Sequence, residues 1–122
     1  MRFIGDDNMA ERIRVLFVCA HGVGSASHAN TFRNFLAKNK MDHLFSVDHA
    51  YEFLTHGGFE DKVLNSDHVV VTNPVITIDK VRQIVRDARA SIPVHDGTEL
   101  WRNWRHAGWC AALLDRIKPD WR

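Results

Sequence analysis

The chain has 122 residues, enough to bury one hydrophobic core and too few for two substantial ones. Hydrophobic residues make up 45% of it and charged residues 25%, as in an ordinary globular protein, and the formal net charge is only +1. So small a charge gives no field that would attract nucleic acid or a membrane surface, and we expect neither nucleic-acid binding nor direct membrane insertion.

The cysteine content and the N-terminal residues favour a cytoplasmic protein. Cys19 and Cys110 are too few for a disulfide framework. The chain does not open with a basic stretch, an apolar segment and a cleavage site, and no apolar run approaches the length needed to cross a bilayer. Residues 1–8 are polar, and we expect them to form a flexible tail before a single domain of residues 9–122.

The first predicted elements are a strand and a helix. Residues 13–20 form a nearly continuous apolar run rich in β-branched side chains, typical of a strand buried on both faces of a parallel sheet. Glycines then permit a turn, and from Ser25 the spacing becomes helical. The apolar residues on one face of this helix are Ala29, Phe32, Phe35 and Leu36.

The middle of the chain repeats this alternation. Residues 44–47 predict a weaker second strand, and residues 51–64 indicate helical pieces broken at Gly57 and Gly58. Residues 68–72 predict a third, buried strand that ends at Asn73 and Pro74. A helix follows, and its expected buried face carries Ile78, Val81, Val85 and Ala88.

The last predicted pair is a brief strand over residues 92–94, ending at Asp96 and Gly97, and a helix that stops before Pro119. The buried face of that helix carries Cys110, Leu113, Leu114 and Ile117. Strands that alternate with helices favour right-handed crossovers onto a parallel sheet. We therefore predict an α/β fold with a four-stranded parallel sheet in the order 2-1-3-4 and helices on both faces, flavodoxin-like or low-molecular-weight phosphatase-like.

In such a sheet, functional groups gather outside the carboxyl ends of the strands, so we expect chemistry in the loop after the first strand. In that loop, successive backbone N–H groups at a helix N-terminus would lie beside a cysteine. Such a row of N–H groups binds a phosphate-sized anion. The same partial positive charge lowers a thiol's pKa from about 8.5 toward the nucleophilic thiolate. We predict Cys19 as the nucleophile. The predicted phosphate-binding residues of this P-loop are Ala20, His21, Gly22, Val23, Gly24, Ser25, Ala26 and Ser27.

The cysteines, histidines and glycines also allow other interpretations. Cys19 could be a small buried residue at a strand end, as free cysteines often are, but its place before a glycine-serine loop favours a reactive thiol. Cys110 lies at apolar helical spacing, so we expect a core residue. Cys19 with His21, and His106 with Cys110, complete no set of four ligands, so no metal is expected. A Walker lysine and the third glycine of a dinucleotide fingerprint are missing, and we expect no cofactor.

Residues 15–27, with the sequence VLFVCAHGVGSAS, resemble the first strand and loop of the enzyme IIB components of the bacterial sugar phosphotransferase system, especially the galactitol-like and ascorbate-like groups. Residues 67–72 are similar to their third strand, and residues 92–97 to their short last strand. The resemblance covers roughly residues 12–118.

The resemblance implies a phosphotransferase. Cys19 would accept a phosphoryl group from a phosphohistidine on a IIA-like donor protein and hold it as phosphocysteine. It would then pass the group to a sugar or sugar alcohol at a IIC-like membrane permease. The backbone from Ala20 to Ser27 would be the phosphate cradle.

Two further functions stay open. Low-molecular-weight phosphatases and arsenate reductases share the architecture, but they need an arginine six residues after the nucleophile, and that place is held by Ser25. Asp96 follows the last strand, where those enzymes place a general acid, although an Asp-Gly pair there is more often a turn. The other function is a non-catalytic, anion-binding regulatory module with a contact surface at Trp101, Trp104 and Arg105.

Overall fold

The computed structural model describes residues 12–20, 23–52, 58–72, 74–97 and 108–122. The strands form one parallel sheet in the order β2-β1-β3-β4, so the predicted α/β class and strand order are confirmed. The strands are β1 (Ile13–Cys19), β2 (Phe45–Tyr51), β3 (His68–Val71) and β4 (Val94–Asp96). The α-helices are α2 (Val23–Lys38), α3 (Gly58–Leu64), α4 (Pro74–Asp87) and α6 (Gly108–Ile117), and short 3₁₀ helices span Asp42–Leu44 and Pro119–Trp121.

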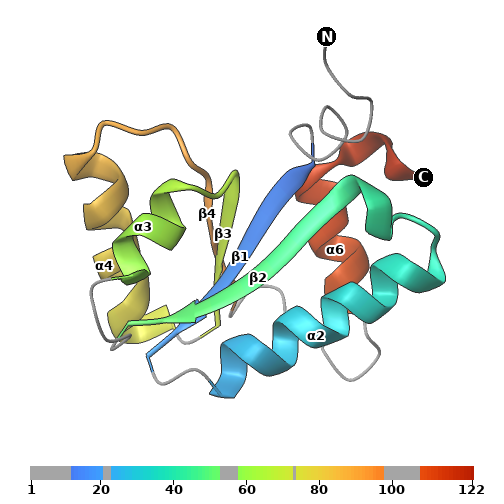
Figure 1. The fold of residues 1–122 in the computed structure, drawn as a ribbon, viewed down its shortest axis with the longest axis horizontal. Helices are drawn as coiled ribbons and strands as arrows, with labels where there is room; N and C mark the ends of the chain where they lie inside the picture. Colours follow the sequence, from blue (N-terminus) through green and yellow to red (C-terminus); the bar gives the residue numbers. More distant parts are fainter. Residues whose placement is uncertain (1–11, 21–22, 53–57, 73, 98–107) are drawn as a thin grey trace, which may run out of the picture.

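Helices cover both faces of this sheet, as Figure 1 shows, with α2 and α6 on one side and α3 and α4 on the other. The two faces of β1 divide the core, because successive side chains of a strand point to opposite faces. Val15 and Phe17 lie in the cluster under α2 and α6, whereas Leu16 and Val18 lie in the cluster under α3 and α4. Burial on both faces explains why β1 reads as a continuous apolar run.

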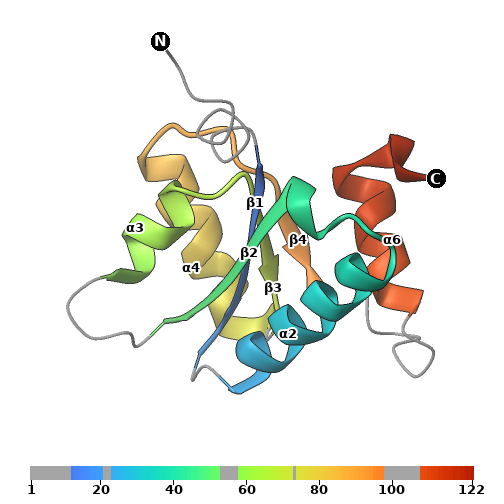
Figure 2. The same ribbon diagram turned by 45° about the vertical axis from the view of Figure 1, so that its right-hand side comes forward.

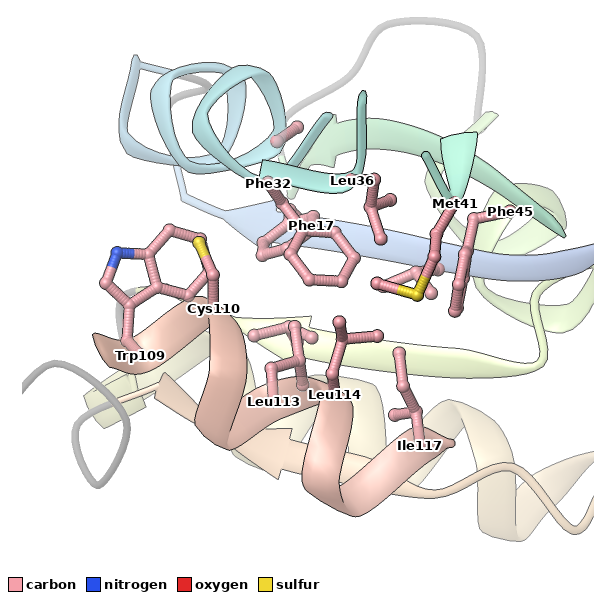
Figure 3. Close-up of a cluster of buried hydrophobic side chains, with 13 residues drawn as sticks. Phe17, Phe32, Leu36, Met41, Phe45, Trp109, Cys110, Leu113, Leu114 and Ile117 are labelled. Atoms are coloured by element: carbon pink, nitrogen blue, oxygen red, sulfur yellow. The ribbon is translucent and has the colours of Figure 1, made fainter. Parts of the chain in front are cut away.

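Aromatic rings fill the space between α2, β1 and α6 (Figure 3). Phe32 of α2 stacks on Trp109 of α6, with 6.2 Å between ring centroids, and Phe17 of β1 contacts Phe32 at 5.7 Å and Trp109 at 6.0 Å. The four apolar residues predicted for the last helix are all buried, so its predicted core face is confirmed. These contacts fix the middle of α2 and the N-terminal end of α6 against β1.

Several predicted boundaries were wrong. The second strand, predicted over residues 44–47, extends to Tyr51 in the structure. The prediction was too short because β2 is an edge strand, and its exposed Ser46 and Asp48 interrupt the apolar pattern. The last strand begins two residues later than predicted, since Pro93 lacks the N–H that a paired strand residue donates. Asp96 therefore belongs to β4 itself and not to a turn after it.

The helix boundaries also differ. Tyr51 belongs to β2, and Gly58 begins α3 where we expected it to break a helix. Ala88 is exposed beyond the end of α4, and Ile84 is the further buried residue on that helix. Pro74 opens α4, where its missing N–H leaves no helical bond unmade. The tail predicted over residues 1–8, Gly57, and the surface predicted at Trp101, Trp104 and Arg105 lie outside the described residues.

Two helices end on left-handed residues that are not glycine. Lys40 after α2 has φ 58°, and Arg89 after α4 has φ 54°. In each case the next amide bonds back over five residues to the helix, Met41 N to Leu36 O at 2.8 Å and Ala90 N to Val85 O at 3.0 Å. This is the Schellman arrangement, which favours glycine at the left-handed position because a Cβ crowds the following carbonyl oxygen there.

We expect Lys40→Gly to raise the free energy of unfolding by roughly 0.5–1 kcal/mol, because glycine removes the steric cost of the left-handed residue. Ala37→Gly, at an exposed position inside α2, should instead lower it by about 1 kcal/mol, since glycine is less favourable than alanine in a helix. Urea denaturation of both variants measures the difference. Equal destabilisation by the two glycines would contradict the assignment of Lys40 as a left-handed cap.

Two imidazoles meet on the α2 and α6 side of the sheet. His68 Nδ1 of β3 lies 3.1 Å from His95 Nε2 of β4, so one nitrogen carries the proton that the other accepts. Burial, followed by the positive charges of His68 and Arg116, lowers the pKa of His95 to about 4. Burial also lowers the pKa of His68, against the raising effect of the Asp67 carboxylate. Sequence gave no sign of this pair, because only the strand register brings the two residues together.

The pair predicts a loss of stability in mild acid. The unfolded histidines bind protons below their ordinary pKa near 6.5, whereas the folded pair resists a second proton down to about 4, so stability falls across that window. We expect the free energy of unfolding to drop by roughly 1–2 kcal/mol from pH 7.5 to 5, after discounting for solvent screening of half-exposed rings.

Urea denaturation at the two pH values tests this expectation. His95→Gln should remove most of the pH dependence, and His43→Gln, on the exposed 3₁₀ helix, should leave it unchanged. An identical drop in His95→Gln would place its origin elsewhere in the molecule.

Candidate functional site

Cys19 is the last residue of β1, an interior strand of the sheet. The strand end is held from both sides: Glu52 N donates to Cys19 O at 2.9 Å, and Thr72 N donates to Val18 O at 2.8 Å. The Thr72 hydroxyl bonds the same Val18 oxygen at 2.9 Å. The cysteine is thereby fixed at the carboxyl edge of the sheet, where open α/β folds place their ligands.

The Cys19 sulfur lies against the first turn of α2. Ser25 N is 3.5 Å from Cys19 Sγ and directs its N–H at it, and the Ser25 Oγ is 3.2 Å away. Both residues are buried, with exposed fractions of 4% for Cys19 and 0% for Ser25. The hydroxyl can accept from the thiol or donate to the thiolate, so two donors are available when sulfur is negative. The contact joins residues six apart in sequence, across the turn that the glycines permit.

α2 begins at Val23, two residues before the helical start expected from the sequence. In an α-helix the N–H groups of the first turn precede the i to i−4 ladder and point out of the helix end. Those of Val23 and Gly24 occupy such positions together with Ser25, whereas that of Ser27 lies within the ladder. Among the described residues of the predicted run, Val23, Gly24 and Ser25 therefore have their N–H groups at the helix end.

The remaining predicted loop residues differ in their surroundings. Ala20 is buried beside Cys19, and Ala26 is half-buried. Ser27 is exposed, and its carbonyl accepts the Thr31 hydroxyl at 3.1 Å. His21, Gly22 and the side chain of Val23 lie outside the described residues.

Gly24 brings the start of α2 close to the end of β3. A Cβ built on Gly24 would lie 3.4 Å from Thr72 Oγ1, the closest distance of ordinary contact. Sequence reasoning did not single out Thr72 as a site residue, although its place after the third strand is the signal that could have found it. The helix end, the strand end and the sulfur therefore lie in one region, with room for no more than a small side chain at Gly24.

His28 was not assigned a role from sequence. Its Nδ1 is 2.7 Å from Gly24 O, and because a carbonyl only accepts, Nδ1 carries the proton. The ring also meets the Trp109 indole edge to face, with centroids 5.5 Å apart. His28 therefore links the first turn of α2 to α6, and it orients the backbone beside the sulfur.

Cys110 has a different environment from Cys19. It is fully buried in the apolar cluster of α6 (Figure 3), and burial raises the pKa of its thiol to about 12. Its predicted assignment to the core is confirmed. Of the two thiols, only that of Cys19 faces hydrogen-bond donors from a helix end in the part of the chain described.

Within the described ranges, no three histidine, cysteine or acidic side chains converge as metal ligands. No helix among the described residues has the length and apolar character needed to cross a membrane. Comparison of the chain with protein-family models, with curated proteins and with solved structures gave no match.

We expect Ser25→Ala to slow alkylation of Cys19 by iodoacetamide at neutral pH by roughly tenfold, because the thiolate loses a hydroxyl donor in a buried place. Ser27→Ala makes the same chemical change at an exposed serine and should leave the rate unchanged. Mass spectrometry of the two cysteine peptides measures the rates, with Cys110 as the slow internal reference. A Ser25→Ala variant that reacts as fast as wild type would show that the hydroxyl does not act on the sulfur.

Proposed function

We propose that the chain is a cytoplasmic phosphoryl carrier of the enzyme IIB kind. Cys19 takes a phosphoryl group from the phosphohistidine of a IIA-like donor protein. It delivers that group to a sugar or sugar alcohol at a IIC-like membrane permease. One observation carries the proposal: the Ser25 amide and hydroxyl converge on the sulfur of a cysteine that ends an interior strand.

The proposed steps use the groups around that sulfur. The thiolate of Cys19 attacks phosphorus, so that an S–P bond forms and the P–N bond of the donor breaks, and the departing imidazole takes up a proton. A sugar hydroxyl later attacks the same phosphorus; an O–P bond forms, the S–P bond breaks to release the thiolate, and the hydroxyl proton passes to water. The Ser25 donors stabilise the thiolate at the start and at the end of the cycle.

The same contacts favour a carrier over a phosphatase. A phosphatase of this architecture clamps the phosphoryl oxygens with an arginine, whose two parallel N–H donors match their geometry. At the corresponding position this chain has Ser25, which is fully buried and bonded to sulfur, so it supplies no cation. A phosphoryl group on Cys19 would therefore lack, at this position of the described chain, the arginine clamp on which rapid hydrolysis by those enzymes depends.

We expect incubation with phosphoramidate, a small donor with the P–N bond of phosphohistidine, to add one phosphoryl group at Cys19. Intact-protein and peptide mass spectrometry locate the group. Cys19→Ser should abolish the labelling, whereas Cys110→Ser should retain it, because that thiol is buried in the apolar core. Hydrolysis of an aryl phosphate should stay near the buffer background.

Three results would redirect the assignment. Labelling that persists in Cys19→Ser would place the acceptor on another side chain and end the phosphocysteine mechanism. Steady turnover of the aryl phosphate that disappears in Cys19→Ser would favour the phosphatase. Binding of inorganic phosphate without any covalent labelling would favour the regulatory module.

A further inference from the structure

β2 forms one edge of the sheet (Figures 1 and 2). In a parallel strand, alternate residues direct both their N–H and C=O groups to the same side. Glu52 N bonds Cys19 O, so the even-numbered residues face β1. The outward groups therefore belong to Phe45, Val47, His49 and Tyr51. An edge of this kind is a template for pairing with another strand.

Three side chains of the chain itself bond these outward groups. Arg33 of α2 donates to Val47 O from Nη2 at 2.6 Å and from Nε at 3.2 Å. Asp48 Oδ1 accepts the His49 N–H at 2.8 Å. Lys62 of α3 donates to His49 O at 3.3 Å and pairs with Asp48 Oδ2 at 3.0 Å. The caps come from helices on both faces of the sheet and meet at the middle of β2.

The stability of the exposed ion pair does not explain this arrangement. Lys62 and Asp48 are both substantially exposed, and such pairs typically contribute less than about 1 kcal/mol. The capping side chains act instead on the addition of another strand to β2. An incoming strand needs the same Val47 and His49 backbone groups that these side chains occupy. The two cations also stand at the edge, where like charges oppose a second copy.

We propose that Arg33, Asp48 and Lys62 close the outer edge of β2 against strand addition, and that the partner they exclude is β2 of a second copy of this chain. Two copies of one strand meet across a two-fold axis as an antiparallel pair, in which each copy supplies the same surface. β2 has seven residues, whereas β4 at the opposite edge has three, so β2 offers the longer ladder. Pairing there would continue the sheet through both molecules.

The test removes the caps together, in Arg33→Ala, Asp48→Ala, Lys62→Ala. The matched control is Asp79→Ala, Lys80→Ala, Arg82→Ala, which deletes the same three residue types from the exposed side of α4. Analytical ultracentrifugation over a concentration series measures association. We expect the uncapped variant to self-associate at least roughly tenfold more tightly than wild type, and the control to behave as wild type.

A proline substitution distinguishes strand pairing from nonspecific association. His49→Pro, added to the uncapped variant, deletes an outward N–H but no bond to β1, and proline is tolerated on edge strands. It should restore the wild-type sedimentation, whereas His49→Ala in the same background should not. Association that survives the proline, or an uncapped variant that stays as monomeric as wild type, would overturn the proposal.

Hydrogen exchange on the wild-type chain tests the caps without any risk of misfolding. The His49 amide should exchange at least roughly tenfold more slowly than an unprotected amide, because Asp48 accepts its proton. Asp48→Asn keeps that acceptor oxygen and should preserve the protection. A wild-type His49 amide that exchanges at the unprotected rate would show that the edge is open in solution, and the proposal would fail.

Discussion

The pairing of β1 between β2 and β3 is the constraint on which the rest of the structure depends. It satisfies the backbone groups on both edges of one seven-residue strand, whose two faces the helices cover, and it fixes the position at which that strand ends. Cys19 is held there by main-chain bonds from Glu52 and Thr72. Because the cysteine is the last residue of the strand, its sulfur meets the first turn of the helix that follows. The position of the thiol is thus a consequence of backbone pairing.

Burying a thiol beside a serine hydroxyl is costly unless each polar group has a partner. Here the two residues satisfy one another, and the Ser25 amide adds a bond from a helix end whose partial charge favours a negative sulfur. The aromatic cluster of Phe17, Phe32 and Trp109 supports the arrangement from behind by fixing α2 against α6. The apolar core and the polar site therefore share the same helix, one on its buried face and one at its N-terminus.

Sequence patterns located the elements that have strong local signals. β1 and β3 were found because a strand buried on both faces reads as an unbroken apolar run, and α6 because four apolar residues recur at helical spacing. β2 was underestimated because its edge position exposes Ser46 and Asp48, so the apolar run breaks although the backbone pairing continues. The start of α2 was placed late because glycines there signal a turn, whereas the structure uses Gly24 inside the first helical turn.

The sequence by itself determined the fold class and the place of Cys19 before a glycine-rich turn, because both depend on neighbours along the chain. The strand order was predicted as well, because alternating strands and helices with right-handed crossovers allow few arrangements of a parallel sheet. Tertiary structure alone decided which groups meet. The contact of Ser25 with the sulfur, the His68–His95 pair and the caps on β2 join residues that only helix packing and strand register bring together. Such contacts leave no periodic trace in the sequence, since each is made by single polar side chains whose partners lie on other turns or elements.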